Sequence, residues 1–438
     1  MMNTIANIAE TLWAPATHLH TEGLSYHAYL TELTWLLLLK IAPAIGSVPV
    51  HLSWESLIHK QGKEQYEYYQ KVIKEMRKSV APLLAGIYAH ARSSFKNPEQ
   101  LAQVITTVDS VPTENLGEIY ETLLEMCADE NENSLHIAPR SLVDLMVILI
   151  QPQPGELIQD PLAGTASFVV AADEYIKVMS DELSNVKIKK RQNFIAIEPD
   201  LARQRLALMN CLLHDIDRSQ DVPVRWGDSL LSNLAEWPTA DVILSMLVFA
   251  SDPTDELGKH DTALALLQHI YQILKPGGRA AVVLPDKVLK AAGPAQEVRS
   301  TLLDTCVVHT VLRLPHGIFY PHKMSTQILF FRKGKTASEK TQSVWFYDLR
   351  THAPIFGQYL HLTRKDLMSF EKAYGDDPLG QRPRREDEDW RCFSRETLAE
   401  QGDRLDGLQD EDMITEEIWD VLDDTMADLE ALTDILGK

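Results

Sequence analysis

Apolar positions recur at helical spacing over the first 128 residues of the chain, with few β-branched runs. Four such stretches cover residues 26–42, 63–91, 97–111 and 115–128. The last two begin at Asn97 and Asn115, and Asn is a residue type that caps helix N-termini. The polar run "DENENS" at 129–134 is typical of a linker. The pattern therefore predicts a helical N-terminal domain over residues 1–130.

The pattern changes after this linker, where short apolar runs alternate with helical stretches. A helix is predicted first, over residues 139–152. Strands are then predicted at 155–163, 193–200, 222–230, 240–249, 279–285, 307–315 and 326–334, with helices at 164–179, 201–216 and 262–275. Alternation of this kind is typical of a doubly wound, mostly parallel sheet covered by helices. We therefore expect an α/β domain over residues 131–375.

The C-terminal part, residues 376–438, has a third pattern. Residues 381–393 are rich in charge and predict a connector. An acidic helix is predicted over 416–438, because apolar residues from Ile418 to Leu436 recur at near-heptad spacing. The pattern leaves two interpretations open: the helix packs on its own domain, or it binds a partner.

Composition narrows the class of protein. A chain of 438 residues predicts two or three domains. The net charge of −21 argues against a protein that coats nucleic acid unaided, since phosphate contacts need clustered Lys and Arg. The longest apolar run, starting at Leu33, is interrupted by Lys40 and is too short to span a membrane. The N-terminus has no basic region of the kind that begins a signal peptide, so we expect a cytoplasmic protein.

Cysteine spacing excludes the usual zinc signatures. The four cysteines have no CxxC pair and lie far apart, at Cys127, Cys211, Cys306 and Cys392. A disulfide framework is not expected, in keeping with a reducing compartment. His316 and His322 flank a short loop, but no further ligands stand at a useful spacing. We expect no metal site.

Three successive predicted strands end in an acidic residue. Asp160 ends the first strand and is followed by Gly164, Glu198 ends the second, and Asp228 follows the third. Ligands of doubly wound sheets bind beyond the carboxyl ends of the strands. These residue types suit S-adenosylmethionine (SAM): Asp160 would accept from the ammonium group, Glu198 from the ribose hydroxyls and Asp228 from the adenine amino group. Each acid alone is equally typical of a helix cap, and the GxGxxG pattern of a dinucleotide fold is absent.

Long stretches of the chain resemble the modification (M) subunit of type I restriction-modification systems. The similarity runs from Gly23 to Tyr374 and is carried by "LMVILIQPQPGELIQDPLAGTASFVVAADEYIK", "RLALMNCLLHDID", "LLQHIYQILKPGGRAAVVLPDKVL", "LLDTCVVHTVLRLPHGIFY" and "VWFYDLRTHAPIFGQ". The resemblance implies a Rossmann-like methyltransferase domain that uses SAM and methylates adenine N6 in DNA.

The resemblance also implies partners. Two M subunits of this family flank a specificity subunit that reads the DNA sequence, and a restriction subunit can join them. A DNA contact through such a subunit would account for the acidic net charge. The C-terminal helix would then contact the other subunits of a DNA-defence (antiphage) complex. The resemblance implies no membrane partner.

The family's catalytic loop is altered in this chain. The family has Asn-Pro-Pro-Phe directly after an apolar strand, and this chain has Met246, Leu247, Val248 and Phe249 after Ser245. In the family, the Asn oxygen and a backbone carbonyl accept the two amino N–H bonds of a flipped-out adenine. A thioether is only a weak acceptor. Loss of one such polar group costs about 3–4 kcal/mol of transition-state stabilisation, so we expect negligible activity.

Other departures lie on the ligand side of the expected sheet. The family has Gly where this chain has Ser167, and a Cβ at Ala166 or Ser167 would crowd the cofactor or restrict a positive φ. Ile137 and Ala138 replace the Phe and Thr of the family's Phe-Thr-Pro segment. The loop after residue 249 is also short. These differences favour a catalytically inactive scaffold or DNA clamp. The alternative is an active adenine-N6 methyltransferase, and SAM binding is left open.

Overall fold

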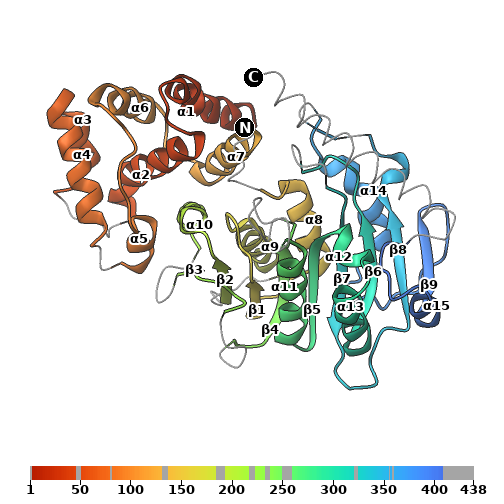
Figure 1. Cartoon of the computed structure of the whole chain (residues 1–438). Coiled ribbons are helices and arrows are strands. Elements are labelled where there is room, and N and C mark those ends of the chain that lie inside the picture. Colours follow the sequence, from red (N-terminus) through yellow and green to blue (C-terminus); the bar gives the residue numbers. More distant parts are fainter. Residues whose placement is uncertain are drawn as a thin grey trace.

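The computed structural model describes residues 2–45, 51–78, 81–130, 137–183, 193–216, 222–231, 237–248, 259–319, 324–354, 356–357 and 360–407. Among the described residues, the regular secondary structure of the first 130 positions consists of helices alone (Figure 1). They are α1 (Met2–Thr21), α2 (Tyr26–Ile45), α3 (Trp54–Ile58), α4 (Gly62–Met76), α5 (Pro82–Ile87), α6 (Pro98–Ser110) and α7 (Leu116–Asp129). The expected helical N-terminal region is confirmed.

The start of each N-terminal helix depends on local chemistry. Asn97 caps α6, since its side chain accepts a hydrogen bond from the Gln100 N–H. Asn115 precedes α7 in the left-handed region, at φ +55°, and makes no capping hydrogen bond with its side chain. The single helix expected over 63–91 is divided into α4 and α5, because Pro82 cannot continue a helix and begins a new one.

One mixed sheet forms the centre of the second part. Its strands are β1 (Leu157–Asp160), β2 (Asn193–Glu198), β3 (Val224–Trp226), β4 (Ala240–Met246), β5 (Leu274–Pro285), β6 (Cys306–Arg313), β7 (Thr326–Lys333), β8 (Ser343–Asp348) and β9 (Trp390–Ser394). In the described part of the chain their order is β3-β2-β1-β4-β5-β7-β6-β8-β9. Strands β3 to β5 pair in parallel in this order, whereas β7 and β9 run antiparallel to their neighbours.

Helices cover both faces of this sheet. One face carries α8 (Arg140–Ile150), α9 (Ser167–Leu183), α10 (Leu201–Leu213) and α14 (Arg364–Tyr374). The other face carries α11 (Lys259–Ile273), α12 (Asp286–Lys290), α13 (Pro294–Thr305) and α15 (Arg395–Glu400). A short 3-10 helix follows β8 at Leu349–His352. The α/β architecture expected from the sequence is confirmed, and none of the described helices is long and apolar enough to cross a membrane.

The charge-rich segment 381–393 contacts the sheet through Arg384 and through its last residues. Its Arg384 guanidinium lies over the rings of Tyr374 and Trp390, at 5.0 and 4.8 Å from their centroids. Strand β9 begins at Trp390 and pairs with β8 along the sheet edge. Residues 381–389 connect α14 to β9 without regular structure, and most of their charged side chains are exposed, so the segment differs from the expected connector in the packing of Arg384 and in the strand at its end. The C-terminal helix expected over 416–438 lies outside the described residues, so its role stays a prediction.

Helix α10 joins the helical region to the sheet. Its Arg205 donates to the main-chain oxygens of Ile87 and Ala89, at 2.9 and 2.8 Å, and lies over the Trp35 ring. Because these carbonyls end helix α5, Arg205 satisfies acceptors that the helix leaves unpaired. The apolar core of α1–α7 also continues without a break into α10, β2 and β3.

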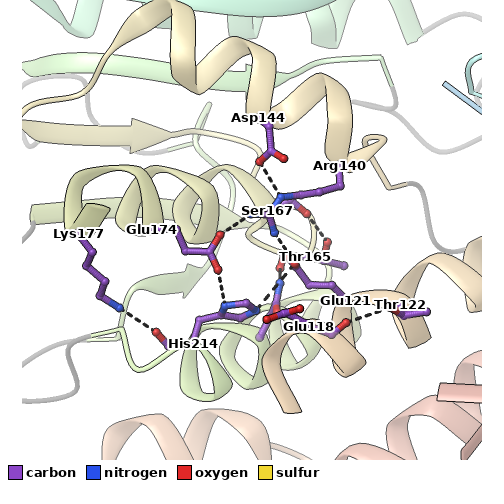
Figure 2. A network of polar contacts seen from close by, with 11 residues as sticks. Glu118, Glu121, Thr122, Arg140, Asp144, Thr165, Ser167, Glu174, Lys177 and His214 are labelled. Carbon is purple, nitrogen blue, oxygen red and sulfur yellow. Dashed lines mark hydrogen bonds and ion pairs between the residues drawn. The ribbon is translucent and has the colours of Figure 1, made fainter. Parts of the chain in front are cut away.

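A partly buried polar network also links the helical region to the α/β part. Figure 2 shows Arg140, at the start of α8, between carboxylates of three helices: Glu121 of α7, Asp144 of α8 and Glu174 of α9. His214, directly after α10, pairs with Glu174 at 2.9 Å. Although burial opposes it, hydrogen bonds from His214 and Arg140 lower the pKa of Glu174 to about 2. The network therefore ties α7 to the α/β part through the ion pair of Glu121 with Arg140.

Candidate functional site

The carboxyl ends of four neighbouring strands bring the sequence-predicted residues to one edge of the sheet. Strands β3, β2, β1 and β4 lie side by side and run parallel, so their last residues meet at the same edge (Figure 1). Asp160 ends β1, Glu198 ends β2, and Met246 ends β4. Asp228 follows β3 by two residues. This edge is where ligands of doubly wound sheets bind.

Asp160 is almost completely buried at the end of β1. Its Oδ1 accepts hydrogen bonds from Ser245 Oγ at 2.7 Å and from the Leu162 N–H at 3.0 Å. No donor of the described residues reaches its Oδ2, which is also buried. Burial raises the pKa of Asp160 to about 7, and the neighbouring Glu198 carboxylate adds to this effect. A cation beside Oδ2 would reverse the shift.

The loop after β1 leaves open space at Gly164. Gly164 has φ +55°, and no described heavy atom would lie within 4 Å of a Cβ built on it. Ala166 also has a positive φ, of +65°, although its Cβ makes that conformation costly. Ser167 begins helix α9, and its hydroxyl lies 3.2 Å from that of Thr165. Besides Gly164, it is Ala166 that has a positive φ in this loop, whereas Ser167 is already part of the helix.

Glu198 is fully buried and holds together the loops that follow β1 and β2. Its Oε2 accepts the Gly164 N–H at 2.9 Å. Its Oε1 accepts the Asp200 N–H and Arg203 Nε, both at 2.9 Å. Its main-chain oxygen accepts the Gly227 N–H, which adds the loop after β3. Burial raises the pKa of Glu198, and the Arg203 guanidinium opposes that effect.

Asp228 lies in an exposed loop, unlike the two buried acids. Its Oδ1 accepts the Leu230 N–H at 2.8 Å, a local turn contact. Trp226 is 61% exposed, and its Nε1 donates to the Pro199 oxygen in the loop after β2. Leu231 is exposed as well. An aromatic ring, a carboxylate and an aliphatic chain are therefore each exposed at or shortly after the end of β3.

The segment after β4 continues into the protein core. Leu247 is fully buried, and its N–H donates to the Val283 oxygen of β5 at 2.9 Å. Val248 is buried in the core of the opposite face, and Met246 packs against that same core. The hydrogen bond of Leu247 closes the last pair of the β4–β5 register, Met246 with Val283. Proline at this position would have no N–H to donate.

Some of the other sequence candidates make no site. Ala138 is buried in the core under α8, and Ile137 packs on the core of the helical region. His316 contacts Ser325 Oγ at 3.3 Å. No group of His, Cys, Asp and Glu suited to a metal occurs in the described ranges, and all four cysteines are free thiols. Phe249 and His322 lie outside the described residues.

Two residues of this edge were not singled out from the sequence. Arg203 lies in the first turn of α10 and reaches back to Glu198. Asn210, two turns further along α10, donates from Nδ2 to the Thr165 oxygen in the loop after β1. The sequence places both residues on a helix that follows an acidic strand end. It does not show which side chains turn toward that end.

Comparison with known proteins identifies related chains over most of the sequence. A family model described as N-6 DNA Methylase matches residues 112–402. The chain is 35% identical over 417 residues to the type I restriction enzyme StySPI methylase subunit of Salmonella potsdam, covering 87% of this chain and 78% of the relative. It is also 35% identical over 424 residues to the EcoKI methylase subunit of Escherichia coli K12, covering 89% and 80%.

The fold agrees with that of a solved relative. The crystal structure of the EcoKI M protein matches with a TM-score of 0.56 and 31% identity, over 99% of this chain and 96% of that chain.

Proposed function

The chain belongs to the N-6 DNA methylase family, among the type I restriction enzyme methylase subunits, and from this premise we propose that it is a subunit that has lost methyl transfer. It acts as a scaffold or DNA clamp in a type I restriction-like DNA-defence complex.

The observation that carries the proposal is the course of the chain after β4. The family uses an Asn and a backbone carbonyl at this point to accept the amino N–H bonds of adenine. Here Met246 offers a thioether, and Leu247 is turned into the core with its N–H bonded to the Val283 oxygen. Loss of one preorganised acceptor costs about 3–4 kcal/mol, or at least two orders of magnitude in rate. Two acceptors are affected together.

An active adenine-N6 methyltransferase is the alternative. It is favoured by the retention of Asp160, Glu198 and Asp228 at the carboxyl edge of the sheet. Incorporation of labelled methyl groups into DNA by the chain, purified with its partners, decides between the two. We expect no incorporation above that of a Met246→Ala control. Sustained methyl incorporation by the wild-type chain that is reduced in Met246→Ala would contradict the proposal.

We place S-adenosylmethionine at the edge formed by β1, β2 and β3. The buried, unpartnered Oδ2 of Asp160 fits an ammonium group, and the open space at Gly164 fits a ligand that approaches the backbone. Asp228 and Trp226 would hold the adenine ring. The cofactor supplies a methyl group on a sulfonium, which this chain would bind without transferring it. Asp160 would give up a proton as the ammonium binds, because a cation beside it lowers its pKa.

Asp228 gives the cleanest test of cofactor binding, because it is exposed and its described hydrogen bond is local. We expect Asp228→Ala to weaken SAM binding about tenfold in calorimetry, the effect of losing one hydrogen bond to a charged acceptor. Asp376→Ala, an exposed acid beside α14, is the matched control and should bind as wild type does. The same titrations in buffers of different ionisation enthalpy should show proton release near pH 7. Equal binding by both variants would remove the cofactor from this edge.

Partners follow from the family. We place DNA against a specificity-type subunit, since the net charge of −21 leaves little general attraction for phosphate. Residues 410–438 would contact that subunit. Their deletion should abolish its co-purification while leaving the melting temperature of the remaining chain unchanged. Retention of every partner after this deletion would contradict the assignment of the segment.

A further inference from the structure

Arg203 covers the carboxylate that would bind the ribose. Glu198 is 0% exposed, and the Arg203 side chain beside it is 22% exposed. Arg203 Nε donates to Glu198 Oε1 at 2.9 Å. A ligand that approaches the end of β2 from solvent therefore meets a guanidinium before it meets the carboxylate.

The acceptor capacity of Glu198 is largely used within the protein. A carboxylate offers about four lone-pair positions. Three are taken: one by the Gly164 N–H on Oε2, and two by the Asp200 N–H and Arg203 Nε on Oε1. A ribose diol needs two positions when it binds a carboxylate through both hydroxyls. One position remains, so recognition of both hydroxyls requires one of the present donors to leave.

Only one of these three donors can leave without moving the backbone. The Gly164 N–H belongs to the loop after β1, which is also held by the hydrogen bond from the Ala163 N–H to the Ile197 oxygen. Asp200 caps helix α10 by accepting the Arg203 N–H at 2.7 Å, which fixes its own backbone. The Arg203 donor is at the end of a long side chain and can rotate away.

We infer that Arg203 competes with the ribose for Glu198 and thereby sets the affinity of this chain for nucleoside ligands. The inference rests on the cofactor position assigned under the proposed function. In the ligand-free protein Arg203 neutralises the buried carboxylate. A nucleoside with both ribose hydroxyls must displace it, and so binds more weakly than the pocket alone would allow.

Removal of the guanidinium tests the inference. We expect Arg203→Ala to bind adenosine at least about tenfold more tightly than wild type, since a hydrogen bond between charged groups no longer has to be broken. The gain in affinity should depend on the presence of both ribose hydroxyls. The affinity for 3′-deoxyadenosine should therefore rise little, and the ratio of the adenosine to the 3′-deoxyadenosine affinity should increase. Arg382→Ala removes the same charge from an exposed position in the segment between α14 and β9 and should change neither affinity. Unchanged or weaker adenosine binding by Arg203→Ala would overturn the inference.

A measurement on the wild-type chain covers the case in which Arg203→Ala does not fold. The Nε–H resonance of Arg203 should shift when the protein is saturated with adenosine and stay in place with 3′-deoxyadenosine. Saturation with adenosine without such a shift would show that Arg203 remains on Glu198, and would overturn the inference. So would the absence of adenosine binding to both wild type and variant at millimolar concentration. Neither outcome affects the methyl-transfer assay on which the proposed function depends.

Discussion

At the scale of single residues, Asp160 shows how burial without a cation changes the behaviour of an acid. Its pKa is raised to about 7, mainly by burial, whereas an Asp in an unfolded chain titrates near 3.9. Between these values the folded protein holds a proton that the unfolded chain has released. The contribution of Asp160 to the free energy of unfolding is therefore at its maximum below pH 4 and decreases as the pH rises to 7.

Replacement of Asp160 by Asn should remove this pH dependence. The Asn oxygen can still accept from Ser245 and Leu162, and the variant has no charge to bury. We expect wild type and Asp160→Asn to unfold at similar urea concentrations at pH 4, and the variant to be more stable at pH 8, by up to about 4 kcal/mol. Greater stability of wild type at pH 8 would mean that Asp160 is ionised and has a cationic partner in the folded protein.

Sequence predicts the place of the acidic residues but not their contacts. Asp160, Glu198 and Asp228 follow consecutive parallel strands, so their arrival at one edge follows from the alternation of strands and helices. Whether each faces solvent depends on packing. Glu198 is buried beside Arg203, five residues along the chain, whereas Asp228 is exposed to solvent. Such differences arise from loop geometry that no spacing rule contains.

At the scale of elements, the end of β4 explains why the altered loop is more than a single lost side chain. The Leu247 N–H continues the hydrogen bonding of β4 with β5, and the Leu247 side chain fills the core beneath α11 and α12. This hydrogen bond closes the last β4–β5 pair, Met246 with Val283, and a proline at position 247 could not donate it. Met246→Asn alone would leave this hydrogen bond intact, so we do not expect it to restore methyl transfer.

Leu247→Pro should destabilise the fold by about 3 kcal/mol or more, since it removes both the N–H donor and a buried side chain. Leu247→Met keeps the N–H and most of the volume and should cost less than about 1.5 kcal/mol. Urea unfolding of the two variants separates the hydrogen bond from the packing. Equal stability of Leu247→Pro and wild type would show that the segment is free to adopt the family's loop.

Strand β9 is one of the elements that the sequence did not predict. Trp390 and Phe393 are buried, but they stand in a segment dominated by charge, which favours a connector. One of these charged residues, Arg384, has contacts that only the fold provides, since its guanidinium lies over the rings of Tyr374 and Trp390. Long periodic elements were predictable, and this edge strand was not, because its stability comes from β8.

At the scale of the whole molecule, the helical region and the α/β part share a closely packed interface. Gly117 of α7 lies against the His214 ring, and a Cβ there would stand 2.8 Å from His214 Nε2. Glycine to alanine in a helix usually stabilises by up to about 1 kcal/mol. Gly117→Ala should instead destabilise by about 1–3 kcal/mol, because His214 is held by Glu174 and cannot yield freely.

A double-mutant cycle locates this cost at the interface. In a His214→Ala background the added methyl group has room, so Gly117→Ala should become neutral or stabilising there. Thermal unfolding of the four proteins measures the coupling. Destabilisation of equal size in both backgrounds would place the strain within α7 itself.

The position of Glu198 bears on how such a chain would change over evolutionary time. Because this side chain receives N–H groups from the loops after β1 and β2, most replacements would be removed by loss of folded protein, whatever the chain binds. If selection for catalysis were relaxed, substitutions would therefore accumulate early in the loop after β4. Glu198 would be retained for much longer. Among the strand-end acids, exposed Asp228 is the one whose survival would record continuing use of a ligand.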